Sequence, residues 1–247
     1  MRPSRDEFRA LAGQHTVVPV WTEVLADLET PVAAYAKLVG AGSGFLLESV
    51  EHGERWSRYS FVGRDPVATL ELRDGHITTF GHVPPSVPLD RGMLAALDEL
   101  LRIYRAPIIP DLPPLQSGVM GYLGYDIVRE VERLPNVPRD DRQLPDAAMS
   151  VIGSLAAFDH WRQRVYLIES VPVLDMDDAQ LDQAYDAAIS RVERAIAERQ
   201  RLHVGAHVGP VRAIDVGHHP PGHRRGAEGA ALAGAAHVQH PAAEMTG

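Results

Sequence analysis

The sequence contains no cysteine, so it can form no disulfide and no thiolate metal site, and it offers no cysteine nucleophile. It also has no apolar run of the roughly 18 residues that a membrane span requires. The first residues, MRPSRDEFRALAG, lack the apolar core of a secretion signal. Together these absences predict a soluble protein of the cytoplasm.

Positive charge is scarce as well, since the formal net charge is -9 at pH 7. A nucleic-acid-binding surface carries a basic stripe, so we expect neither nucleic acid nor membrane as a partner. Lys37 is the only lysine among the 24 basic side chains. This preference for arginine indicates GC-rich coding, which bears on the last part of the chain.

Local signals predict four helices. Ser4 and Glu7 form a capping box at the start of the first, and Thr30-Pro31 opens the second. Asp90 is the expected N-cap of a helix that continues to about Tyr104. The last helix is expected over 178–199, where apolar residues recur at helical spacing.

Strand patterns outnumber the helical ones. GFLLESV and RWSRYSFVG, separated by EHGE, read as a hairpin, and Asp74-Gly75 marks a second hairpin within VATLELRDGHITTF. SGVMGYLGY is a glycine-punctuated strand element. AAMSVIGSLAAFD and RVYLIESV form a further strand pair joined through HWRQ. The predicted fold class is therefore α+β, with a mainly antiparallel sheet and packed helices.

The composition changes at about residue 200, which divides the chain into a domain over 1–200 and a low-complexity tail over 201–247. The tail holds 7 of the 12 histidines and no aromatic residue of the Phe, Tyr or Trp type. Its His218, His219 and His223 are candidate metal ligands by residue type, but the intervening PPG prevents a helix from presenting His219 and His223 together. The composition favours a shifted reading frame over an authentic disordered linker.

Few motifs in 1–200 point to chemistry. No phosphate-binding glycine loop and no Gly-x-Ser-x-Gly elbow occurs. Asp159-His160 could be a catalytic dyad, but adjacent residues in a predicted turn point apart. The first hairpin offers Glu48, Arg58 and a Leu46-Leu47 pair, which match in type the ammonium, carboxylate and apolar side chain of an amino acid. The same residues also fit an ordinary hairpin with exposed charges, and alternation keeps Glu48 and Ser49 on opposite faces of a regular strand.

Four stretches closely resemble the N-terminal region of anthranilate synthase component I. They are VPVWTEVLADLETPVAAYAKL, FLLESVEHGERWSRYSFVGRDPVATLEL, SGVMGYLGYDIVREVERLP and LPDAAMSVIGSLAAFDHWRQRVYLI, in the same order, over roughly 5–200. The resemblance implies a lyase of tryptophan biosynthesis that converts chorismate to anthranilate and pyruvate. It also implies Mg²⁺ as cofactor in the full-length enzyme and a glutamine amidotransferase subunit, component II, as the partner that delivers ammonia.

The resemblance further implies feedback inhibition by L-tryptophan as an effector. The LLES segment of the family contributes to that site, and its matching residues here are Leu47, Glu48 and Ser49. Arg58 stands where a basic residue of the second strand reaches the site in relatives. No catalytic residue and no metal ligand is assigned, because the motifs of the family's C-terminal half do not occur in this sequence.

The expected function is therefore that of a truncated anthranilate synthase component I that keeps part of the L-tryptophan site and is inactive alone. Two alternatives stay open. The chain could be a non-enzymatic tryptophan-sensing or assembly module, or a fragment of the related aminodeoxychorismate synthase component I. A fragment whose strands lack their partners could also fail to fold.

Overall fold

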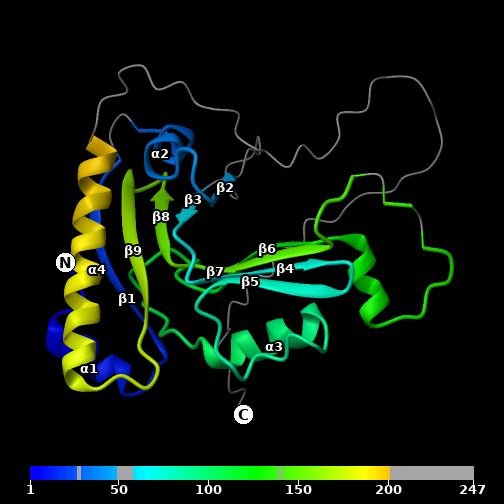
Figure 1. The fold of residues 1–247 in the computed structure, drawn as a ribbon. Coiled ribbons are helices and arrows are strands. Elements are labelled where there is room, and N and C mark those ends of the chain that lie inside the picture. Colours follow the sequence, from blue (N-terminus) through cyan, green and yellow to red (C-terminus); the bar gives the residue numbers. More distant parts are fainter. Residues whose placement is uncertain (27–28, 49–57, 138, 141, 201–247) are drawn as a thin grey trace, which may run out of the picture.

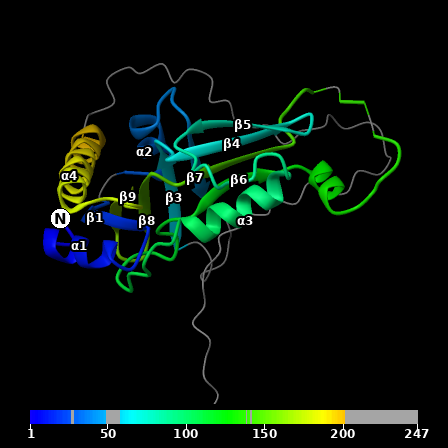
Figure 2. The same ribbon diagram turned by 60° about the horizontal axis from the view of Figure 1, so that its bottom comes forward.

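The computed structural model describes residues 1–26, 29–48, 58–137, 139–140 and 142–200. These residues form two antiparallel sheets whose strands run across one another, with helices packed on both (Figures 1 and 2). The predicted α+β class is confirmed. Residues 201–247, for which the sequence favours a shifted frame or a disordered linker, lie outside the described residues.

The larger sheet has five strands in the order β1-β9-β8-β3-β2, so β1 and β2 are its edges. The smaller sheet has four strands in the order β5-β4-β7-β6. The five strands of the first are β1 (Val17–Leu25), β9 (Arg164–Pro172), β8 (Ser154–Asp159), β3 (Tyr59–Arg64) and β2 (Gly44–Glu48). The four strands of the second are β5 (His76–Gly81), β4 (Ala68–Arg73), β7 (Ala147–Val151) and β6 (Val119–Leu123).

Helices cover one face of each sheet. α1 (Arg5–Ala12), α2 (Pro31–Leu38) and α4 (Asp178–Gln200) pack on the five-stranded sheet, and α3 (Met93–Ile103) packs on the four-stranded sheet. A short 3-10 helix, η1 (Tyr125–Glu130), follows β6. No helix among the described residues is long and apolar enough to cross a bilayer.

The ends of α1, α2 and the β4–β5 hairpin follow the predicted local signals. Ser4 and Glu7 make the reciprocal bonds of a capping box, and the Thr30 side chain accepts the N–H of Ala33. Asp74 and Gly75 have φ of 50° and 74°, the left-handed pair that a tight two-residue hairpin requires.

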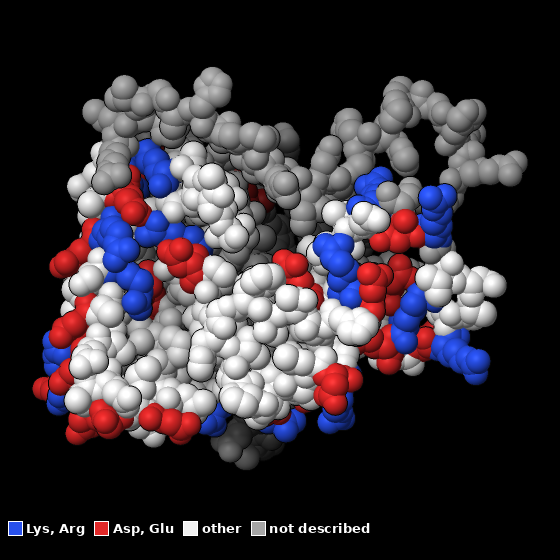
Figure 3. All heavy atoms as spheres, in the orientation of Figure 1, with Lys and Arg blue, Asp and Glu red and all other residues white. Residues whose placement is uncertain are grey.

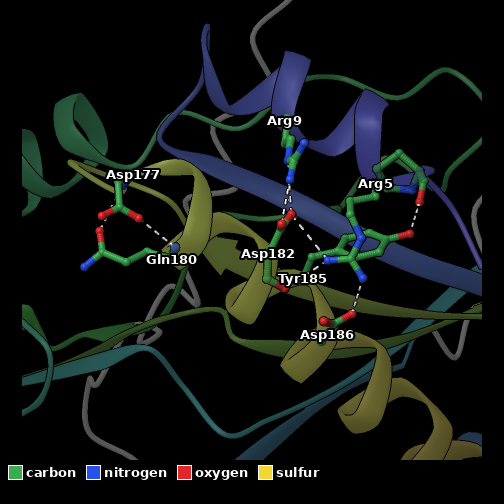
Figure 4. Close-up of polar contacts among 8 residues, drawn as sticks. Arg5, Arg9, Asp177, Gln180, Asp182, Tyr185 and Asp186 are labelled. Carbon is green, nitrogen blue, oxygen red and sulfur yellow. Dashed lines mark hydrogen bonds and ion pairs between the residues drawn. The ribbon is translucent and has the colours of Figure 1, made fainter.

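Charged side chains fix α1 on α4 (Figure 4). Arg9 donates to both carboxylate oxygens of Asp182, at 3.0 and 2.5 Å, and Arg5 donates to Asp186 at 2.5 Å. The Tyr185 hydroxyl donates to the carbonyl of Pro3 at 2.7 Å. These bonds join segments more than 170 positions apart and hold the start of the chain on the last described helix.

The start of α3 differs from the prediction. Asp90 is not its N-cap. The N-cap is Gly92, with φ of 90°, which has no side chain to accept a hydrogen bond from the first turn. The carboxylate of Glu130 instead accepts the N–H groups of Met93, at 2.6 Å, and Leu94, at 2.9 Å. The prediction was wrong because the capping group comes from η1, far along the sequence.

The strand prediction was wrong in two places. AAMSVIGSLAAFD is not one strand, because the chain leaves the four-stranded sheet after Val151 and enters the five-stranded sheet as β8. Gly153 permits this crossing, since a Cβ there would lie 1.9 Å from the carbonyl oxygen of Asp65. No element was assigned to 17–25, which forms β1; its first five residues are all buried and give no alternating pattern.

Candidate functional site

Two of the predicted effector residues, Leu47 and Glu48, lie in β2 at the outer edge of the five-stranded sheet. In β2, Leu47 faces Phe61 and Glu48 faces Ser60 of β3. Residues that face each other across two strands point to the same side of a sheet, and neighbours alternate. Leu47 therefore lies on the Phe61 side, where it is 39% exposed, and Glu48 lies on the opposite side. Ser49 lies outside the described residues.

Arg58 lies next to β3, at the end where the described part of the hairpin begins. Its Nε donates to Oδ1 of Asp159 at 3.1 Å and its Nη2 donates to Oδ2 at 2.6 Å. The guanidinium also lies over the rings of Tyr59, at 4.7 Å, and Trp161, at 5.0 Å. Tyr59 faces Asp159 and shares its side of the sheet with Phe61. The Arg58 guanidinium and Leu47 are thus on the same side, and Glu48 is on the other.

The Asp159 carboxylate is 2% exposed and serves as an acceptor for four donors. Besides Arg58, the backbone N–H groups of Trp161 and Arg162 donate to Oδ1, at 3.1 and 3.2 Å. Burial raises the pKa of Asp159, but the bonds from Arg58, Arg162 and Trp161 together outweigh it, so the net pKa is lowered. The group is a carboxylate at neutral pH, and it holds the β8–β9 turn as well as Arg58.

His160 points away from Asp159. Its Nε2 lies 2.8 Å from Oγ of Ser60, and its ring stacks on Phe158 at 6.3 Å. Ser60 and Phe158 face each other on the side opposite Asp159. Asp159 and His160 therefore form no catalytic dyad. The sequence predicted this outcome, because adjacent residues in a turn point apart.

The sequence analysis identified Arg58 but not the residues that surround it. Asp159 is 101 positions away from Arg58, a separation for which the sequence gives no signal. A weaker signal exists for the turn: an aspartate at a strand end often accepts the N–H groups two or three residues later. Asp159 does so, and Trp161 is brought beside Arg58 by that turn.

Other described surfaces offer no clear alternative. A cavity of about 420 Å³ lies against β1, at the edge of the sheet opposite β2, and none of the predicted effector residues lines it. Charged side chains of both signs gather over α4 and at the far end of the molecule, with a largely uncharged surface between them (Figure 3). Among the described residues, no group of three His, Cys, Asp or Glu side chains is placed to hold a metal ion.

Comparison with known proteins supports the resemblance, although no family model matches the sequence. Anthranilate synthase component 1 of Mycolicibacterium smegmatis is 42% identical over 191 residues, which are 77% of this chain and 36% of that protein. The protein of the same name from Arthrobacter globiformis is 38% identical over 196 residues, 79% of this chain and 37% of that protein.

A solved structure of anthranilate synthase component I from Streptococcus pneumoniae is 24% identical, with a TM-score of 0.42, over 69% of this chain and 36% of that chain. The chain spans little more than a third of the length of the curated relatives it matches. Over about three quarters of its length, this chain is thus homologous to the N-terminal region of anthranilate synthase component I.

Proposed function

We propose that this chain is the L-tryptophan-sensing portion of an anthranilate synthase component I of tryptophan biosynthesis, and that it does not turn over chorismate alone. The observation that carries the proposal is the 42% identity over 77% of the chain to a protein of that name. Such a chain would act in the cytoplasm, where we expect tryptophan synthesis. The relatives are longer, and we assign the binding of chorismate and Mg²⁺ to residues of theirs that this chain does not match.

The geometry of β2 and Arg58 supports an amino-acid effector. Leu47 supplies an apolar wall, and Arg58 supplies guanidinium donors on the same side of the sheet. Glu48 supplies an acceptor for an ammonium group from the other side. Because β2 is an edge strand, a ligand beside it can reach side chains of both sides. We keep Ser49 as a fourth contact on the strength of the resemblance alone.

Tryptophan binding can be measured by titration calorimetry on the purified 247-residue chain. Leu47→Ala should weaken binding, because it removes a wall that an indole ring would cover. Leu101→Ala is a matched control, since Leu101 of α3 is also 39% exposed but packs on the other sheet. The proposed site would be contradicted if the wild-type chain gave no heat of binding, or if both variants lost it equally.

Catalysis is tested separately. Purified chain incubated with chorismate, Mg²⁺ and ammonium should form no fluorescent anthranilate, because the chain spans little more than a third of the length of its relatives. Steady product above the blank would contradict the proposal. We also propose that component II is the partner of the complete enzyme; co-elution of component II with this chain would place the docking surface within it.

A further inference from the structure

The Arg58 guanidinium contacts three other side chains. Asp159 binds one edge of the guanidinium through two bonds, and Tyr59 and Trp161 lie over it at 4.7 and 5.0 Å. Its side chain is nevertheless 28% exposed. A guanidinium held in this way keeps a fixed plane while one part of it still reaches solvent.

The partner carboxylate is itself costly to bury. A buried ion pair gains little net stability over apolar packing, because both charges lose their hydration. Asp159 offsets this loss with four donors, so that Arg58 is bonded to a group that is already fixed by the β8–β9 turn. Nη1 of Arg58 donates to no acceptor in the described part of the chain, whereas Nε and Nη2 are both used.

A second arginine pair shows what purely structural pairing looks like in this molecule. Arg9 also binds a carboxylate with two bonds, that of Asp182, but both side chains are more than 30% exposed. That pair joins two helices and has no aromatic ring over the Arg9 guanidinium among the described residues. The Arg58 arrangement adds burial of the acid and two aromatic rings within 5.0 Å of the guanidinium carbon, which are features that fix orientation rather than merely join two segments.

We infer that Asp159 is a positioning residue for the effector site: it orients the Arg58 guanidinium, between Tyr59 and Trp161, to receive the carboxylate of an amino-acid effector. This inference rests on the proposed function. Asp159 does not touch the ligand in this arrangement, because both of its oxygens are bonded to protein donors. Its effect passes entirely through Arg58, so the two residues should be energetically coupled in ligand binding.

The test is a double-mutant cycle on L-tryptophan affinity, measured by titration calorimetry of the full 247-residue chain. Asp159→Asn keeps an oxygen acceptor for the turn N–H groups but removes the charge and one bond to Arg58. It should weaken binding about tenfold, the effect of losing roughly one charge-assisted bond. Arg58→Gln should weaken binding at least as much, and Arg58→Gln with Asp159→Asn should be no weaker than Arg58→Gln alone.

Asp182→Asn is the matched control, since it breaks the other two-bond arginine pair and should leave L-tryptophan affinity unchanged. Wild-type affinity in Asp159→Asn, or additive losses in the double variant, would overturn the positioning role while the proposed function stands. No binding by the wild-type chain would overturn the proposed function, and the inference with it.

If circular dichroism shows that Asp159→Asn does not fold, Trp161→Ala replaces it. Trp161 is 61% exposed, so its removal should leave the fold intact and free one face of the guanidinium. We expect a loss of affinity of about threefold, in line with a stacking contact of under 1 kcal/mol. Unchanged affinity in a folded Trp161→Ala would contradict the inference.

Discussion

The two sheets of this molecule bury different kinds of side chain. The four-stranded sheet and α3 enclose a core in which every buried residue is apolar, with Leu70, Met93 and Leu100 fully covered. The five-stranded sheet carries buried polar groups within its strands as well. They are Ser60 of β3, Ser154 and Asp159 of β8, and Glu169 and Ser170 of β9.

This difference follows from what each sheet has to pack against. The five-stranded sheet has apolar clusters on both of its faces: two under α1, α2 and α4, and one toward Leu112 and Met120. Its buried charges meet arginines that reach in from outside: Arg58 bonds to Asp159 and Arg191 bonds to Glu169 at 2.8 Å. Apolar burial stabilises both sheets, and among the described residues the buried charged side chains, Asp159 and Glu169, lie in strands of the five-stranded sheet. Specific recognition is therefore expected there.

The largest expected effect is on the four-stranded sheet. Leu70→Ala removes a side chain with no exposed surface and should cost about 3 kcal/mol of unfolding free energy, because of the lost burial and the cavity left behind. Chemical denaturation measures this, with Leu70→Met as a control that should cost less than about 1.5 kcal/mol. L-tryptophan affinity of the folded fraction should not change. A change in affinity would break the distinction between a packing sheet and a recognition sheet.

The next effect is a dependence on pH that belongs to the five-stranded sheet. Because the folded-state pKa of Asp159 is lowered, its carboxylate contributes stability above its unfolded pKa of about 3.9. That contribution should be lost as the pH falls through the lower folded-state value. Denaturation at a series of pH values measures it. Asp159→Asn should flatten the curve of unfolding free energy against pH below about pH 4, whereas Leu70→Ala should keep the wild-type slope. Parallel curves for the wild type and Asp159→Asn would mean that the acid sensitivity comes from groups other than Asp159.

Sequence reasoning succeeded where the deciding contacts are local. The capping box of Ser4 and Glu7, the Thr30 cap and the Asp74-Gly75 turn each depend on residues at most three positions apart. The apolar stripe of α4 was also predicted, since helical spacing is a property of the segment itself. These features together were sufficient for the α+β class.

The failures all involve contacts between distant segments. The Gly153 crossing depends on the backbone of Asp65, and the neighbours of Arg58 come from a turn about 100 positions later. For the candidate site, the sequence predicted Leu47, Glu48 and Arg58 by type and resemblance. Alternation alone places Leu47 and Glu48 on opposite faces. The sequence could not predict which of the two shares the side of Arg58, because this depends on the register of β2 against β3 and of β3 against β8.

The cap of α3 provides a smaller test in the four-stranded half. Glu130→Ala should cost about 1.5 kcal/mol of unfolding free energy, because two backbone N–H groups at a helix N-terminus lose a charged acceptor. Asp90→Ala, at the position that the sequence favoured, should cost less than about 0.5 kcal/mol. Thermal unfolding of the two variants measures the difference. Equal losses would mean that the cap alternates between the two acids, and that distant contacts matter less for this sheet than the structure indicates.

The smallest expected effect concerns the turn between β4 and β5. Gly75 has φ of 74°, and a Cβ added there would meet no neighbouring atom within 4 Å. Gly75→Ala should therefore cost only the backbone penalty of the left-handed region, about 1 kcal/mol, with no steric clash. Gly75→Asn is the matched control, since asparagine tolerates this conformation and should restore most of the loss. Because both hairpin strands belong to the four-stranded sheet, thermal unfolding should report the change while the pH slope and L-tryptophan affinity stay at wild-type values. A turn substitution that altered either would show that the two sheets are coupled through β7 and β8, which follow each other directly in the chain.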